Sequence, residues 1–241
     1  MVALLEVHGI SKSFSGLRAV QDVSFSVPEG EIVGLIGPNG AGKTTCFNLI
    51  AGVYRPDAGT VRLGGEDIGG WRPDQVCRAG LARTFQLVKP FADLTVMENV
   101  VVGALNNCPT VYEARQKSAE VIDKLGLGSK RDQVAKALTL PERKRLEVAR
   151  ALATGPRILL LDEVMAGLRP TEMNTMVALF RDLNASTGLT ILLIEHVMRA
   201  VMALSRTVVV LHHGQVIASG SPDQVTRDPA VLESYLGEEA L

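Results

Sequence analysis

The sequence predicts an α/β fold in which helices cover a parallel sheet, with an antiparallel β subdomain beside it and an inserted α-helical subdomain. Apolar runs without polar alternation are typical of parallel strands buried on both faces. Three such runs follow residue 156: Ile158–Leu161, Ile191–Ile194 and Val208–Leu211. Helical periodicity instead dominates residues 87–155. Residues near the start alternate between apolar and polar types, which indicates antiparallel strands.

The composition limits the class of protein. The 241 residues are 46% hydrophobic, enough for a real core in one large domain or two joined lobes. A net charge of −1 gives no electrostatic reason to expect nucleic acid as a partner. No apolar run approaches the ~18 residues of a membrane span, and Met1–Gly9 lacks a signal-peptide core. Three cysteines without a metal or disulfide spacing suit a reducing cytoplasm.

The antiparallel elements come first along the chain. Leu4–Phe14 and Arg18–Val27 are predicted as strands. Thr60–Ile68 contains a Gly64-Gly65 turn between two further short strand segments. These pieces together predict a small antiparallel sheet beside the main one.

Proline and glycine mark the ends of the predicted helices. One helix opens at Pro109-Thr110 and ends at Gly126, and another follows Pro141 and ends at Gly155-Pro156. Four basic residues on the second helix are expected on a solvated face, the alternative being contact with a partner or a phosphate: Arg143, Lys144, Arg145 and Arg150. Strand signals then return at Arg157–Glu163, Leu189–His196 and Thr207–Gly220. A helix between the first two has one apolar face, formed by Met173, Met176, Val177, Phe180 and Leu183.

A glycine-rich loop predicts a nucleoside-triphosphate site. It fits the pattern G-x-x-x-x-G-K-[ST] and lies between an apolar strand, Glu31–Gly37, and a helix. Glycines let the backbone N–H groups curl around phosphate, and the helix N-terminus favours an anion. Lys43 is expected to reach the β- and γ-phosphates, and the Thr44 hydroxyl to hold Mg²⁺. The residues predicted to bind nucleotide are Gly37, Pro38, Asn39, Gly40, Ala41, Gly42, Lys43, Thr44 and Thr45.

Acidic residues at a strand end predict the second half of this site. Asp162 and Glu163 close an apolar strand, at the sheet edge where ligands of open α/β sheets bind. Asp162 is expected to hold Mg²⁺, mostly through water, and Glu163 to orient and deprotonate the attacking water. His196 closes the next strand and is expected to contact the γ-phosphate. Gln86, which ends a short strand in RTFQ, is expected to contact Mg²⁺ or the lytic water.

The order and spacing of GPNGAGKTT, Gln86, LLLDE and His196 resemble the ATPase subunit of an ABC transporter. This resemblance implies a P-loop NTPase core of RecA-like, ABC ATPase type. Residues 1–86 and 156–241 would form the nucleotide-binding core with its β subdomain, and residues 87–155 the helical subdomain. It also implies a head-to-tail dimer that sandwiches each ATP, with an aromatic ring stacked on adenine. Phe14 has the matching position, although a core Phe of an antiparallel strand is the alternative.

The stretches KSFSGLRAV, RTFQLVKPFADLTVMENV, LDEVMAGLRPTE and IEHVM resemble the ATPase subunits of branched-chain amino-acid importers. That resemblance implies permease subunits, a second and usually different ATPase, and indirectly a solute-binding protein. It also implies a peripheral position on the cytoplasmic face of the cell membrane. The alternatives are an ATPase that extracts lipid or lipopolysaccharide, and a soluble ABC-type ATPase acting on nucleic acid or ribosomes.

One stretch departs from the family pattern. The family signature resembles LSGGQ, whereas Leu138–Glu142 reads LTLPE. Thr139 can replace the Ser hydroxyl that contacts ATP, but Leu140 adds bulk and Pro141 has no N–H to donate. Arg169 stands where the family commonly has Asp or Asn. The sequence therefore predicts that an ATP site closed by this signature is weak.

Overall fold

The main sheet of the computed structural model has six strands in the order β10-β9-β3-β8-β7-β6. The model describes residues 2–86 and 89–236. Five strands run parallel, and β10 pairs antiparallel with β9 at one edge. The strands are β3 (Ile32–Ile36), β6 (Leu81–Arg83), β7 (Ile158–Asp162), β8 (Thr190–Ile194), β9 (Thr207–His212) and β10 (Gln215–Gly220). The predicted strand region 207–220 is thus a hairpin, which turns at His213 and Gly214, both with positive φ.

The central strands are buried on both faces, as their unbroken apolar runs predict. In β7, Leu159 and Leu161 join the hydrophobic cluster on one face of the sheet. Ile158 and Leu160 point the other way and join the second cluster. Alternate residues of a strand face opposite sides of the sheet. One short apolar run therefore contributes side chains to both hydrophobic clusters.

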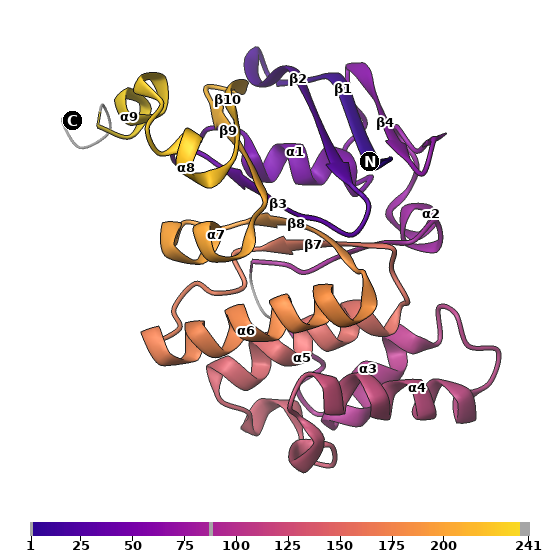
Figure 1. Cartoon of the computed structure of the whole chain (residues 1–241). Helices are drawn as coiled ribbons and strands as arrows, with labels where there is room; N and C mark the ends of the chain where they lie inside the picture. Colours follow the sequence, from indigo (N-terminus) through magenta and orange to yellow (C-terminus); the bar gives the residue numbers. More distant parts are fainter. Residues whose placement is uncertain (1, 87–88, 237–241) are drawn as a thin grey trace.

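An antiparallel sheet lies above one face of the main sheet, with helix α1 (Lys43–Ile50) between them (Figure 1). Its strand order is β2-β1-β4-β5, which confirms the predicted β subdomain. The strands are β1 (Ala3–Phe14), β2 (Leu17–Pro28), β4 (Ala58–Leu63) and β5 (Glu66–Asp67). Phe47 and Ile50 of α1 are almost completely buried within this layer. The phosphate-loop helix is therefore fixed from both sides.

Helices cover the other face of the main sheet (Figure 1). Threonine caps begin three of them, because Thr95, Thr110 and Thr139 each precede a helix with an acidic residue three positions later. The helices of this layer are α3 (Val96–Ala104), α4 (Val111–Lys124), α5 (Leu140–Ala153), α6 (Pro170–Thr187) and α7 (Met198–Leu204). The remaining α-helices of the described part are α2 (Pro73–Arg78), α8 (Pro222–Val225) and α9 (Pro229–Leu236).

The predicted helical subdomain contains α3, α4 and α5, and its buried side chains share one cluster with the sheet and α6. Ala114, Ser118 and Ile122 form the buried face of α4. The predicted start of the subdomain at residue 87 lies outside the described residues, and the division of the chain remains a prediction. No helix in the described part of the chain is long and apolar enough to cross a membrane.

Candidate functional site

The phosphate loop joins the end of β3 to the start of α1, in close contact with two neighbouring strands. A Cβ on Gly37 would lie 2.0 Å from the carbonyl oxygen of Leu211 in β9. One on Gly42 would lie 2.4 Å from the carbonyl oxygen of Ala19 in β2. Gly42 also has φ 101° and caps α1, a conformation that side chains disfavour. Only glycine fits at these two positions, so the motif is also a packing requirement.

Lys43 folds back over this loop. Its Nζ donates hydrogen bonds of 2.7 Å to the carbonyl oxygens of Gly37 and Pro38, and the residue is 6% exposed. The loop thus holds a buried ammonium group beside backbone N–H groups at a helix N-terminus. That combination of charge and dipole favours phosphate.

A cavity of about 720 Å³ opens over the loop. It gathers most of the predicted site residues: Phe14, Asn39, Gly40, Ala41, Gly42, Lys43, Thr44, Thr45, Gln86, Glu163 and His196. Asp162 lines an adjoining cavity of about 460 Å³, which shares Thr44 and Gln86 with the first. Segments far apart in sequence therefore meet at the carboxyl ends of β3, β7 and β8, as ligand sites of open α/β sheets do.

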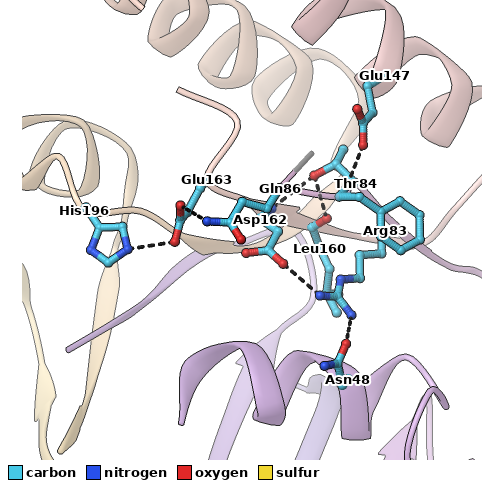
Figure 2. Close-up of polar contacts among 10 residues, drawn as sticks. Asn48, Arg83, Thr84, Gln86, Glu147, Leu160, Asp162, Glu163 and His196 are labelled. Atoms are coloured by element: carbon cyan, nitrogen blue, oxygen red, sulfur yellow. Dashed lines mark hydrogen bonds and ion pairs between the residues drawn. The ribbon is translucent and has the colours of Figure 1, made fainter. Parts of the chain in front are cut away.

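Glu163 is the centre of the polar contacts in this cavity (Figure 2). Its Oε2 accepts a 2.8 Å hydrogen bond from Gln86 Nε2, and its Oε1 lies 2.7 Å from His196 Nε2. Its backbone φ is 49°, in the left-handed region that residues with side chains seldom occupy. The turn directs this carboxylate toward the cavity, whereas the carboxylate of the preceding Asp162 is directed at Arg83 (Figure 2).

Asp162 is almost completely buried and forms an ion pair with Arg83. Arg83 Nη2 lies 2.8 Å from Asp162 Oδ2, and Arg83 Nη1 donates a 2.5 Å bond to Asn48 Oδ1 (Figure 2). The other carboxylate oxygen, Oδ1, is buried without a hydrogen-bond partner among the described residues. Sequence reasoning missed Arg83, although it precedes Gln86 by only three positions in RTFQ. One oxygen of Asp162 thus remains able to accept a further ligand.

Gln86 lies in a loop and does not end a strand as predicted. β6 ends at Arg83, and only Thr84 continues the pairing, through its N–H to Leu160 O at 2.9 Å. The next N–H, of Phe85, instead donates to Glu147 Oε1 on α5 at 2.5 Å. The chain leaves the sheet at this point, which allows the Gln86 side chain to turn toward Glu163.

Phe14 stands at the rim of the cavity above the loop. The residue is 37% exposed, and its ring contacts Tyr54 edge to face, with 5.1 Å between centroids. The alternative that Phe14 is a core residue of an antiparallel strand is therefore wrong. An accessible aromatic face beside a phosphate loop has the chemistry needed to stack on a base.

Thr139 lies apart from the cavity lining, at the N-cap of α5. Its hydroxyl donates to Glu142 Oε2 at 2.9 Å, and its N–H donates to the same oxygen at 2.8 Å. Pro141 is the second residue of the helix. Within this chain the LTLPE stretch is a capped helix start, with its hydroxyl already hydrogen-bonded.

Three buried ionisable residues surround the acidic turn. Lys144 is 5% exposed, so the expectation that it lies on a solvated helix face is wrong. Burial raises the pKa of Glu147, and it raises the pKa of Glu195 to about 7. Glu195 Oε1 accepts a 2.9 Å hydrogen bond from the N–H of Met165, two residues after Glu163. Because Lys144 is distant from the turn in sequence, no local pattern predicts that it is buried beside the turn.

The protein alone offers few metal ligands. Among residues 2–86 and 89–236, no group of three or more His, Cys, Asp or Glu side chains could hold a metal. Mg²⁺ at phosphate sites commonly uses one or two protein ligands together with phosphate oxygens and water. Thr44 and Asp162 suit that type of site, because both line the same cavity and Asp162 Oδ1 has no hydrogen-bond partner within the described part of the chain.

Comparisons with known proteins agree with this geometry. The ABC transporter family model matches residues 20–166, and a branched-chain amino acid ATP-binding cassette transporter model matches residues 215–240. The chain is 39% identical to the branched-chain amino acid transport ATP-binding proteins BraF of Pseudomonas aeruginosa and LivG of Escherichia coli, over 98% of each chain. It is 36% identical to the lipopolysaccharide export ATP-binding protein LptB of Haemophilus influenzae, over 99% of both chains.

A solved ATP-binding cassette of an ABC transporter, in its ADP conformation, has the same fold. The TM-score is 0.90 at 31% identity, over 98% of this chain and 100% of the other. The sheet topology and the loop between β3 and α1 define a P-loop NTPase. Within that class the chain belongs to the family of ABC transporter ATP-binding proteins, which hydrolyse ATP.

The raised pKa of Glu195 predicts a pH-dependent stability. The folded state keeps a proton that an unfolded glutamate releases near pH 4.5, so this stabilisation is complete below about pH 4.5 and is lost by about pH 7. Glu195→Gln removes the titration and keeps an acceptor for Met165. In urea unfolding, the free energy of unfolding of the variant should exceed that of the wild type by on the order of 3 kcal/mol at pH 8, and by much less at pH 5. An equal difference at both pH values would contradict the assignment.

Proposed function

We propose that this chain is the ATPase subunit of an importer for branched-chain amino acids or related small solutes, working beneath separate permease subunits. The main support is the convergence of Lys43, Asp162, Glu163 and His196 on two adjoining cavities at the phosphate loop, which share Thr44 and Gln86. Similarity to BraF and LivG over nearly the whole chain supports the class of solute. The protein would lie on the cytoplasmic face of the membrane, held there by its permease.

ATP would lie between the phosphate loop and the rim of the cavity. The backbone N–H groups of residues 39–45 and the Lys43 ammonium would bind the phosphates, and Phe14 would stack on adenine. Thr44, Asp162 and Gln86 would hold Mg²⁺, directly or through water, and the ion would neutralise charge on the β- and γ-phosphate oxygens. The Oδ1 atom of Asp162, which no described residue hydrogen-bonds, supports this assignment.

Glu163 would act as the general base. Its carboxylate would orient a water molecule and accept a proton from it as the water oxygen bonds to the γ-phosphorus and the bond to ADP breaks. Gln86 contacts one oxygen of Glu163 and His196 the other, which fixes the carboxylate in the cavity. His196, 43% exposed in its side chain, would also reach the γ-phosphate.

A groove beside the site would receive the permease. It has a volume of about 280 Å³ and is lined largely by apolar side chains, including Val53, Val76, Phe85 and Val102. Phe85 is 60% exposed and precedes Gln86 directly. An apolar cytoplasmic segment of the permease bound here would therefore touch the loop that carries Gln86 to Glu163, and solute transport would be coupled to the ATP site.

Similarity to LptB supports lipopolysaccharide extraction as a second candidate. The two functions differ in the direction of transport and in the chemistry of the cargo. Complexes purified with their native membrane subunits and reconstituted into vesicles would separate them. ATP-dependent uptake of labelled leucine supports the importer, whereas release of lipopolysaccharide without any uptake contradicts it.

In the assembled complex, Glu163→Gln should retain ATP binding and lower steady-state hydrolysis at least a hundredfold, because loss of a general base typically costs ~10²–10⁴ in rate. Lys43→Ala should instead weaken ATP binding, because it removes a charge held beside the β- and γ-phosphates. Titration calorimetry and phosphate release measure the two effects. Near-normal turnover of Glu163→Gln, or an unchanged Kd for Lys43→Ala, would contradict these roles.

We also propose pairing with a second, different ATPase whose own phosphate loop faces the LTLPE stretch of this chain. That site would lack the N–H that Pro141 cannot donate. Replacing Leu140 and Pro141 together with Gly should speed hydrolysis there by roughly 10- to 100-fold. Single-turnover assays, with the general base removed from this chain, isolate that site. Thermal unfolding controls for the weaker helix start, and an unchanged rate in a folded variant would contradict the proposal.

A further inference from the structure

One face of α5 carries two buried ionisable side chains to which the reaction above assigns no role. Lys144 and Glu147 lie three positions apart, so they project from the same side of the helix. They are 5% and 8% exposed. Burying ionisable groups is costly unless they are paired and hydrogen-bonded. Their contacts therefore indicate why the helix carries them.

Each of the two side chains is hydrogen-bonded to the backbone at, or next to, one partner of the Gln86–Glu163 hydrogen bond. Lys144 Nζ donates a 3.1 Å bond to the backbone carbonyl of Glu163. Glu147 Oε1 accepts a 2.5 Å bond from the N–H of Phe85, the residue before Gln86 (Figure 2). One rigid helix thus supports both the residue that donates and the residue that accepts this 2.8 Å bond.

The backbone at Glu163 needs such support. Its φ of 49° is an uncommon conformation that persists only when the surroundings hold it. Lys144 binds its carbonyl oxygen, and Glu195 binds the N–H of Met165 two residues later. Burial raises the pKa of both Glu147 and Glu195, and the positive charge of Lys144 opposes part of this rise. The turn and the loop before Gln86 are therefore linked through Lys144 and Glu147.

We propose that Lys144 and Glu147 are positioning residues, which set the geometry of the Gln86–Glu163 pair and thereby the place of the attacking water. This inference rests on the proposed role of Glu163 as general base.

The test compares substitutions that keep or remove each hydrogen bond in the assembled transporter complex. Lys144→Met and Glu147→Met remove the donor and the acceptor, whereas Lys144→Arg and Glu147→Gln retain them. Arg145→Met is the matched control, since it changes the charge of the adjacent residue, which lines a different hollow of the surface. The readouts are kcat, KM and Kd for ATP, and the unfolding temperature of each complex.

We expect each Met variant to lower kcat by roughly 10- to 100-fold, as small displacements of reacting groups do. The KM and Kd for ATP should change less than twofold, because the phosphate loop is untouched. Lys144→Arg and Glu147→Gln should recover most of the lost rate. A Met variant that also loses ATP binding or unfolds early shows a structural role and counts against the inference. If the conservative variants fail as completely as the Met variants, or if kcat and Kd change together, the inference is overturned.

A double substitution separates this inference from the proposed function. In a Glu163→Gln background, Lys144→Met should lower the remaining rate less than threefold, because a positioning residue acts through the group that it positions. Multiplied losses would overturn the inference. If Glu163→Gln alone leaves turnover normal, the proposed function fails. If Glu163→Gln loses a hundredfold and Lys144→Met loses nothing, only the positioning role fails.

Discussion

The ion pair between Arg83 and Asp162 is the interaction on which the arrangement of the site depends. Both side chains are almost completely buried, and Arg83 also binds Asn48 of α1. It thus joins β6, β7 and the phosphate-loop helix at one point. Removing one partner of a buried pair typically costs about 3–5 kcal/mol, because the remaining charge has no compensation. The spacing between the phosphate loop and the acidic turn is set by this contact.

Two adjacent carboxylates acquire different surroundings because the strand ends between them. Asp162 still belongs to β7, where its side chain is buried against Arg83 and keeps one oxygen without a partner among the residues that the structure describes. Glu163 has left the strand with a positive φ, and its carboxylate lies in the cavity between Gln86 and His196. Such a difference separates a residue suited to a metal from one suited to move a proton. The proposed division of roles thus follows from local backbone geometry.

Sequence patterns predicted the parts of the structure that local chemistry determines. The apolar runs gave the parallel strands, and the glycine motif gave the loop whose glycines meet Leu211 and Ala19. The sequence did not predict that Lys144 and Glu147 hydrogen-bond the turn and the loop beside it, because these contacts depend on tertiary structure. Lys144 lies 19 positions from Glu163, and Glu147 lies 62 positions from Phe85. In sequence they belong to an ordinary charged helix, and only the packing of α5 on the sheet shows their burial.

The central claim is that this chain binds ATP together with Mg²⁺ at the edge formed by β3 and β7. Calorimetric titration of the purified chain with ATP, with and without Mg²⁺, tests it most directly. The account predicts tighter binding with Mg²⁺ and the loss of that increment in Asp162→Asn, which keeps a side-chain oxygen to accept the Arg83 hydrogen bond and therefore retains binding without Mg²⁺. Equal affinity with and without Mg²⁺, or an unchanged increment in Asp162→Asn, would contradict the account.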